Sequence, residues 1–355
     1  MSKAAQFKSL LTRAYPWIQT PFIVGAPMRV MSGASLAVAI SEARGLGFIG
    51  PGAKAGDIFH ELEAAKTLLA ASPALKQLEP SVPLPIGVGF QTWNGDLDTA
   101  VSAVHKYMPC AAWLFAPRHG QKELDEWTDR IRRASEMTKI WVQVGSLCEA
   151  LDAAQSVYAP DILVLQGTEA GGHGRAVDGM GLITLLPEIQ DKLDQMGSTI
   201  PLLAGGGIAD GRGVVAAFGL GAAGVVMGTR FLASTEARIA KGYQDEIIRA
   251  NNGAVSTVRT HLYNHLRGTF GWPEQFSPRT VVNQTWVDHK EGVAFEELQK
   301  RHNEAVALGD GGWGPDGRLA TYAGANIGLI HSVGDAASIV QKTRDEAVGI
   351  IKSLQ

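Results

Sequence analysis

Short apolar segments recur along the first two thirds of the chain, and each one ends in glycine, proline or a polar loop. The segments are continuous apolar runs rather than alternating ones, which is typical of strands buried on both faces of a parallel sheet. Eight of them cover residues 21–28, 45–50, 84–90, 111–117, 139–146, 161–167, 200–208 and 222–231. Stretches with apolar residues at helical spacing lie between them, at 32–44, 56–71, 123–137, 146–157 and 210–221.

This alternation of strand and helix predicts an α/β protein with a closed TIM (β/α)8 barrel. A doubly wound open sheet is the alternative, and eight nearly regular repeats favour closure of the barrel. We expect the barrel to comprise residues 20–235 together with a returning segment at 320–355.

The pattern changes after residue 231. Residues 234–250 and 295–309 have helical periodicity, whereas residues 251–284 are irregular, polar and aromatic. The amphipathic tail at 339–355 is expected to pack back on the barrel. We therefore predict a mostly helical and partly irregular lid or substrate subdomain at 240–320.

Composition narrows the class of partner. The 355 residues are 45% hydrophobic and 19% charged, with a formal charge of −3 and no basic stripe, so nucleic acid is not an expected partner. No apolar run reaches the ~18 residues of a membrane helix, so no membrane partner is expected either. The first 17 residues carry three basic side chains and no acidic one, but lack a long apolar core. A cytoplasmic location is expected, with a mitochondrial one as the alternative.

Two cysteines, Cys110 and Cys148, have no spacing that suggests a metal site, and two do not make a disulfide framework. Neither is placed where a barrel needs a loop nucleophile, because Cys110 begins a strand and Cys148 begins a helix. We expect no metal.

Glycine-rich segments follow the last two predicted strands, where barrels commonly bind phosphate. Glycines there expose backbone N–H groups to an anion. Tight turns alone would also explain them, but their occurrence at both strand ends favours phosphate. The predicted phosphate-binding residues are Gly205, Gly206, Gly207, Gly228 and Thr229.

A phosphate in this place usually belongs to a nucleotide-sized cofactor or a phosphorylated substrate. Other strand ends would then surround a flat ring: the first strand ends in "GAPM", and the fifth and sixth carry amides. A buried amide with a local partner is the simpler reading of each glutamine. The predicted ring contacts are Ala26, Pro27, Met28, Gln143, Gln166, Gly171 and Gly172.

The segment "QGTEAGGHGR" at 166–175 carries the strongest candidate for catalysis. Its four glycines are untypical of a helix or strand, and His173 follows two of them at a strand end. An imidazole with a pKa near 6.5 suits proton transfer at neutral pH, although a loop histidine can also merely bond a carbonyl. Three other histidines, His60, His105 and His302, are expected to face solvent. His261 and His265 are at helical spacing from each other in the irregular segment and are candidates to reach a pocket.

These motifs together resemble the nitronate monooxygenase family, also called 2-nitropropane dioxygenases. The resemblance covers residues 21–232, resumes weakly at 323–333, and is more similar to the fungal branch. It implies a TIM barrel with noncovalent FMN and with His173 as base or anion-binding group. It also implies that alkyl nitronates such as propionate 3-nitronate are oxidised with O2 to a carbonyl compound and nitrite, a detoxification chemistry. His173 would bind the nitronate as a cation, or take an α-proton from a neutral nitroalkane. A homodimer is compatible with the sequence.

Two positions depart from the family pattern. Gly89 stands where many relatives have asparagine after the third strand, and Gln143 stands where many have lysine. We keep Gly89 and Gln143 among the expected flavin contacts, but the loss of lysine removes a positive charge that would favour reduced flavin.

The alternative function is NAD(P)H-dependent reduction of quinones or enoyl thioesters, since FMN reductases on the same barrel have a similar glycine-histidine loop. NAD(P)H consumption would discriminate, because nitronate oxidation needs no nicotinamide. A noncatalytic FMN carrier would bind flavin without turnover. Trp272, Trp313 and Tyr322 either line the substrate side or form the lid core, and the core is favoured for Trp272.

Overall fold

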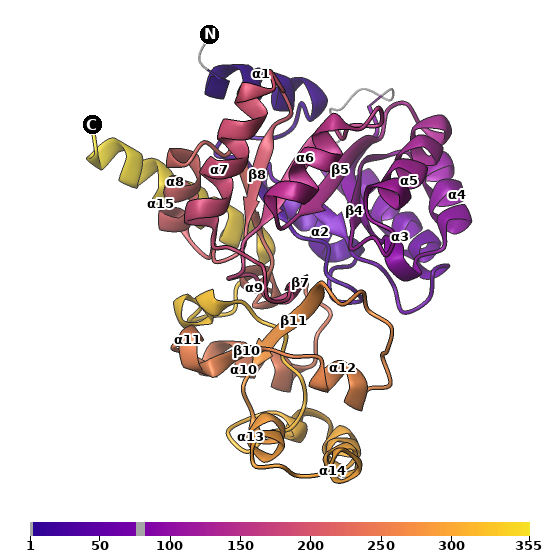
Figure 1. Cartoon of the computed structure of the whole chain (residues 1–355). Helices are drawn as coiled ribbons and strands as arrows, with labels where there is room; N and C mark the ends of the chain where they lie inside the picture. Colours follow the sequence, from indigo (N-terminus) through magenta and orange to yellow (C-terminus); the bar gives the residue numbers. More distant parts are fainter. Residues whose placement is uncertain (1–2, 76–81) are drawn as a thin grey trace.

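Eight parallel strands close into a barrel in the computed structural model, which describes residues 3–75 and 82–355. They follow chain order around the barrel, and the last strand pairs with the first (Figure 1). The strands are β1 (Ile23–Gly25), β2 (Leu46–Ile49), β3 (Leu84–Gln91), β4 (Pro109–Phe115), β5 (Lys139–Val144), β6 (Ile162–Gln166), β8 (Leu202–Gly205) and β9 (Gly224–Met227). The predicted barrel is confirmed, and the doubly wound sheet is excluded because such a sheet stays open.

Helices cover the outside of the barrel, as the sequence predicts. They are α2 (Ala34–Glu42), α3 (Asp57–Ala71), α4 (Leu97–Tyr107), α5 (Gln121–Ala134), α6 (Leu147–Gln155), α7 (Leu182–Gln195), α8 (Gly211–Gly219) and α15 (Ala336–Ser353). Two of these, α4 and α7, were not among the helical stretches predicted above. Helix α7 contains Pro187, a residue that usually marks a helix end.

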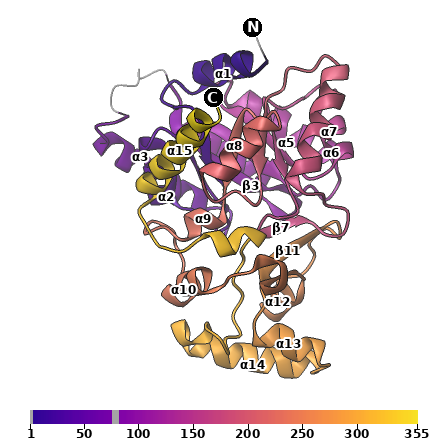
Figure 2. The same ribbon diagram turned by 90° about the vertical axis from the view of Figure 1, so that its left-hand side faces the viewer.

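The returning tail packs as expected. Helix α15 lies against α8 and α2 on the outside of the barrel (Figure 2). Its fully buried Arg344 donates to the carbonyl oxygens of Ala43 and Arg44, both at 3.1 Å. A Cβ atom at Gly211 would stand 2.4 Å from the backbone nitrogen of Ala347, so glycine is required where α8 meets α15.

Large aromatic side chains fill the barrel. The ring of Phe48 lies 4.9 Å from that of Trp141 and 5.2 Å from that of Trp113, measured between centroids. The Trp141 indole donates to the hydroxyl of Tyr15 at 2.7 Å, and both side chains are completely buried. Tyr15 follows α1 (Lys3–Ala14), which lies at the end of the barrel away from the orange segments (Figure 1).

The chain between the last barrel strand and α15 forms a second layer at the carboxyl ends of the strands (Figure 1). After α9 (Thr229–Leu232) we call this segment, residues 233–335, the cap. It contains α10 (Lys241–Arg249), α11 (Gly253–Ser256), β10 (Thr257–Arg259), α12 (Leu262–Leu266), β11 (Phe276–Val281), α13 (Gln284–Lys290), α14 (Phe295–Ala307) and the 3-10 turns η2 (Gly309–Gly312) and η3 (Ala325–Leu329). The helix expected at 234–250 is confirmed only for α10, and the one expected at 295–309 is α14.

A small antiparallel sheet corrects two expectations. Residues 251–284 are not irregular, since they contain β10 and β11, and part of the glycine-histidine segment is a strand, β7 (Gly172–Arg175). The order is β10-β11-β7, so β7 is an edge strand. Backbone pairing with β11 holds it there, which outweighs the weak strand preference of its glycines.

Candidate functional site

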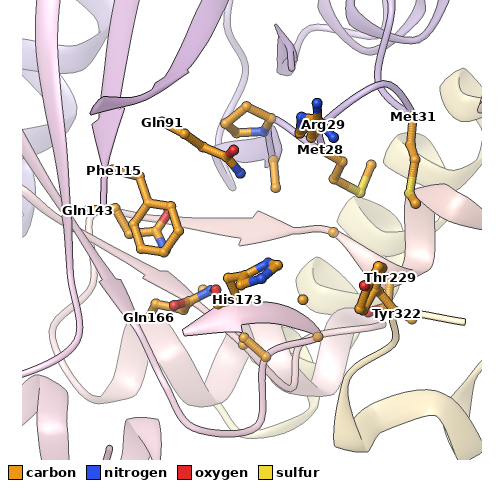
Figure 3. Close-up of a pocket in the computed structure, with 18 of the residues that line it drawn as sticks. Met28, Arg29, Met31, Gln91, Phe115, Gln143, Gln166, His173, Thr229 and Tyr322 are labelled. Carbon is orange, nitrogen blue, oxygen red and sulfur yellow. The ribbon is translucent and has the colours of Figure 1, made fainter. Parts of the chain in front are cut away.

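A cavity of about 280 Å3 opens between the carboxyl ends of the barrel strands and the cap. Its wall brings together thirteen of the fourteen residues predicted from the sequence, and Figure 3 shows several of them around the open space. They are Ala26, Pro27, Met28, Gln143, Gln166, Gly171, Gly172, His173, Gly205, Gly206, Gly207, Gly228 and Thr229.

The exception is Gly89, which lines a smaller adjoining cavity of about 100 Å3. A Cβ atom at Gly89 would stand 2.3 Å from Cβ of Pro27, so an asparagine there would displace the end of β1. Gln91, two residues further along β3, lines both cavities, as do Arg29 and Asn94.

The glycine segment after β8 presents unused donors. Gly206 and Gly207 have φ angles of +112° and +75°, which favour glycine. In the described part of the chain, the backbone N–H groups of Gly206, Gly207 and Thr229 donate to no other group. The Thr229 hydroxyl oxygen accepts from the backbone N–H of Gly324 at 3.0 Å, which leaves its own proton free to donate. This set can bind an anion such as a phosphate.

Two other glycines leave room beside the cavity. A Cβ atom at Gly172 would meet nothing within 4 Å, and one at Gly228 would be in ordinary contact with Ala26 and Met28. Packing within the protein therefore does not explain the missing side chains there, although the φ of +65° at Gly172 also favours glycine. Close approach by a bound ligand would explain both.

The two predicted glutamines have local partners and one free end each. Oε1 of Gln143 accepts from the Trp113 indole at 3.0 Å, and Nε2 of Gln166 donates to the carbonyl oxygen of His173, also at 3.0 Å. Each amide thus has the local partner that the simpler interpretation predicts, and this hydrogen bond orients it. Both still line the cavity, so the remaining amide atoms can bond a ligand.

A half-buried arginine of the cap holds the glycine-histidine segment in place. Arg259 donates to the carbonyl oxygens of Thr168, Ala170 and Gly172 at 3.1–3.2 Å. Burial lowers the pKa of its guanidinium to about 10, and the positive charge of Arg279 acts in the same direction. The loop before His173 is therefore ordered by a charge that belongs to β10, which no local sequence signal predicts.

The imidazole of His173 is held on one face and at one nitrogen. Trp272 stacks on it with a centroid distance of 3.6 Å and an interplanar angle of 9°. Nε2 lies 2.9 Å from Nδ2 of Asn264, which is almost completely buried. Burial holds the pKa of His173 well below 6.5, and positive charge from His261, Arg267, Arg259 and Arg29 lowers it further. The imidazole is uncharged at neutral pH.

Positive charge dominates the cavity. Arg29 and Arg267 are in its wall, and no aspartate or glutamate of the described chain lines it. A low-dielectric site with cations and no carboxylate favours anionic ligands.

Several side chains outside the predicted set differ from expectation. Trp272 lines the cavity instead of packing in the lid core, because the loop before β11 lays it across His173. Tyr322 also lines the cavity, whereas Trp313 packs in a cap cluster with Tyr243. His302 is buried at 3% exposure rather than solvent-facing, because the inner face of α14 packs against the rest of the cap.

The other histidine expectations have mixed outcomes. His60 and His105 are exposed, as predicted. His261 and His265 do not line the cavity, and Asn264 between them does. Asn264 was not among the predicted residues, since a lone asparagine in a polar segment carries no pattern.

Metal and thiol chemistry find no support in the described residues. They contain no cluster of three or more His, Cys, Asp or Glu side chains that could hold a metal ion. Cys110 is buried and burial raises the pKa of its thiol, while Cys148 is exposed and lies outside the cavity. Among the described helices, none combines the length and apolar character that crossing a membrane requires.

Comparison with family models and curated sequences finds nitronate monooxygenases. The family model described as nitronate monooxygenase matches residues 124–269. The chain is 60% identical to nitronate monooxygenase npaC of Metarhizium robertsii over 98% of this chain and 96% of that protein. It is 34% identical to nitronate monooxygenase of Neurospora crassa over 99% and 97% of the two chains. Both relatives are fungal, as the resemblance implied.

A solved structure shares the fold at lower identity. FabK from Thermotoga maritima superposes with a TM-score of 0.70 at 26% identity, covering 97% of each chain. The likeness extends over the cap as well as the barrel.

Proposed function

The chain belongs to the nitronate monooxygenase family of enzymes, and from that premise we propose that it binds FMN and oxidises alkyl nitronates with O2 to a carbonyl compound and nitrite. Propionate 3-nitronate is the substrate we expect. The observation that carries this proposal is the cavity wall, which joins His173 to two arginines and no described carboxylate. A nitronate is an anion, and so is the phosphate of FMN.

The residues fit a bound FMN. The unused N–H groups of Gly206, Gly207 and Thr229 would hold its phosphate, and the open space at Gly172 and Gly228 would admit its ring system. Gln143 and Gln166 would bond polar atoms of the ring or the ribityl chain. A volume of about 280 Å3 is close to the usual lower limit for a ligand pocket.

Within this site, the bound flavin supplies an acceptor for the electrons of the nitronate and a route for them to O2. The protein's residues bind and orient the substrate. Arg29 and Arg267 supply positive charge, and His173 is the group we expect to contact the nitro function. Its lowered pKa supports an uncharged imidazole over a cation. An uncharged imidazole can accept a proton from a nitroalkane or donate a hydrogen bond to a nitronate.

The cap controls access in this proposal. The ring of Trp272, which stacks on His173, lies 4.9 Å from that of Trp93 between centroids and is tilted by 44° to it. Arg118 lies over Trp93. Arg118 also donates to the carbonyl oxygen of Gly271 at 2.7 Å, which ties the loop after β4 to the cap. We propose that this aromatic wall keeps water from the reacting atoms.

The test is anaerobic mixing of the purified protein with propionate 3-nitronate while the flavin absorbance is recorded. Released cofactor is first identified by mass as FMN. A change of the flavin spectrum on mixing, followed by nitrite release on admission of air, supports the proposal.

Two other results would overturn it. A spectrum that ignores nitronate but bleaches with NADH or NADPH would establish the reductase alternative. Failure to bind FMN after reconstitution would mean that the glycine segments hold something else.

A further inference from the structure

A chain of hydrogen bonds leads from the cap to His173. Arg267 donates to the hydroxyl oxygen of Tyr322, the Tyr322 hydroxyl donates to Oδ1 of Asn264 at 2.9 Å, and Nδ2 of Asn264 lies 2.9 Å from Nε2 of His173. All four residues line the cavity. The relay ends on the residue that the proposed function assigns to the substrate.

The direction of this relay follows from what each group can do. A guanidinium only donates, so the Tyr322 oxygen accepts from Arg267 and the single phenol proton is left for Oδ1 of Asn264. The amide is thereby oriented with its NH2 group toward His173. The opposite orientation would place two donors on the phenol oxygen and would leave the phenol proton with no acceptor in the described chain.

A second neighbour supports the same orientation. Nδ1 of His261 lies 3.4 Å from Nδ2 of Asn264, so both hydrogens of the amide face imidazole nitrogens. Burial lowers the pKa of His261, which keeps that imidazole uncharged and able to accept. The amide NH2 therefore has two acceptors, and its oxygen has the phenol as donor.

This orientation determines which nitrogen of His173 carries the proton. Because Nε2 accepts from Asn264, the proton of the uncharged imidazole is on Nδ1. Nδ1 makes no hydrogen bond to a described residue. A buried atom without a partner would be an unsatisfied polar group, and Nδ1 is not one of these, so it is accessible in the cavity that His173 lines. Stacking with Trp272 fixes the plane of the ring, and the contact with Asn264 fixes which nitrogen faces the cap.

We propose that Asn264 is a positioning residue that keeps the proton of His173 on Nδ1, so that the enzyme offers its substrate a hydrogen-bond donor and selects nitronate anions over neutral nitroalkanes. This inference rests on the proposed function. A nitronate has already lost its α-proton and needs only a donor for its oxygen. A nitroalkane needs a base, and both nitrogens of His173 are engaged, Nε2 by the amide and Nδ1 by its proton.

The direct test is the tautomer of His173 in the FMN-loaded protein. Histidines are labelled with 15N, one-bond and two-bond 1H–15N correlations are recorded, and His173 is assigned by its absence in His173→Gln. The expected spectrum has a protonated Nδ1 and an unprotonated Nε2. A proton on Nε2 would overturn the assignment. The NMR spectrum does not depend on turnover, so a wrong tautomer assignment can be distinguished from a failure of the proposed function.

Selectivity is tested with a matched pair, ethyl nitronate and nitroethane, which differ by one proton. We expect kcat/KM to favour the nitronate by about 100-fold or more, which is the usual contribution of a positioned base that is missing here. Comparable values for the two would overturn the selectivity. In Asn264→Asp a carboxylate accepts from Nε2–H, which leaves Nδ1 free to take the α-proton of nitroethane and release ethyl nitronate. In this variant the ratio of kcat/KM for ethyl nitronate to kcat/KM for nitroethane should fall about tenfold or more.

Tyr322→Phe is the control for the relay. It keeps the ring and removes the phenol proton that orients the amide, without touching His173. We expect both tautomers of His173 in its spectrum, and an unchanged single tautomer would refute orientation through Tyr322. Flavin content and thermal unfolding establish that each variant is folded. If a variant does not fold, the spectrum of the wild-type protein still decides the tautomer of His173.

Discussion

His173 is defined by the residues around it more than by its own chemistry. A tryptophan covers one face of the ring, an asparagine engages one nitrogen, and arginines of the barrel and the cap add positive charge. Burial and the nearby positive charges favour the uncharged imidazole. The histidine could be predicted from its glycine-rich segment, but Asn264 and Trp272 could not, because they reach the site from residues about ninety and a hundred positions later in a segment without periodicity.

Replacing His173 by asparagine should weaken rather than abolish nitronate oxidation. A hydrogen bond to a charged group contributes ~1.5–3 kcal/mol, so kcat/KM for ethyl nitronate should fall about 10- to 100-fold. Any residual turnover of nitroethane should disappear with the imidazole. The measurement is steady-state oxygen consumption with both substrates, with flavin content as the control. Turnover of ethyl nitronate at the wild-type level would remove His173 from the reaction.

The pH dependence of kcat/KM should lack a step near pH 6.5. Burial, followed by the positive charges of the nearby arginines and of His261 when acid protonates it, lowers the pKa of His173 well below that value. The imidazole therefore titrates well below pH 6.5, and no step centred at that pH is expected. Initial rates with preformed nitronate across pH 6–8 test this. A sigmoid centred near 6.5 would mean that the imidazole titrates as it does in water.

At the level of elements, buried strands were the most predictable part of the chain. Each of the eight apolar runs overlaps a barrel strand, since burial on both faces makes such a segment apolar throughout. Six runs contain their strand completely, while β3 continues one residue past its run and β4 begins two residues before its run. Strand β7 was not predictable. Its four residues pair through backbone groups with a strand about a hundred residues later, so their own side chains carry almost no strand signal.

The segment that follows the N-terminal helix is joined to the barrel by a buried hydrogen bond of Tyr15. Tyr15→Phe would leave the Trp141 indole N–H without its acceptor in a fully buried position. An unsatisfied buried donor costs ~1–3 kcal/mol, and the free energy of unfolding should fall by that amount. Urea titration followed by tryptophan fluorescence measures it. An unchanged midpoint and slope would indicate that another acceptor, such as water, replaces the hydroxyl.

On the scale of the whole molecule, the barrel and the cap share the cavity. Barrel strands contribute the glycines and amides, and the cap contributes Asn264, Arg267, Trp272 and Tyr322. The sequence predicted a separate segment because the β/α alternation stops at residue 231, and the role of this segment as a lid stays a prediction. It did not predict which side chains of the lid meet the barrel, since that depends on long-range packing.

Acid should destabilise the folded protein well above the pKa range of carboxylates. Burial is the main cause that lowers the pKa values of His173, His261 and His302 from 6.5. Below about pH 6.5 the unfolded chain gains protons that the folded chain does not bind, so the free energy of unfolding falls as the pH drops. Urea unfolding of FMN-saturated protein at pH 7.5 and 5.5 measures the difference. His302→Gln should reduce it, and equal stability at both pH values would contradict this account.

The pairing of β7 with β11 has a consequence for how such enzymes diverge. The backbone of His173 lies opposite Pro278. In this sheet β7 belongs to a loop of the barrel, and β10 and β11 belong to the cap. An exchange of the cap between relatives by recombination would therefore separate the histidine strand from the partner it evolved with, unless residues 172–175 travelled with it. A chimera with the cap of a relative should therefore take residues 172–175 from the same relative as the cap.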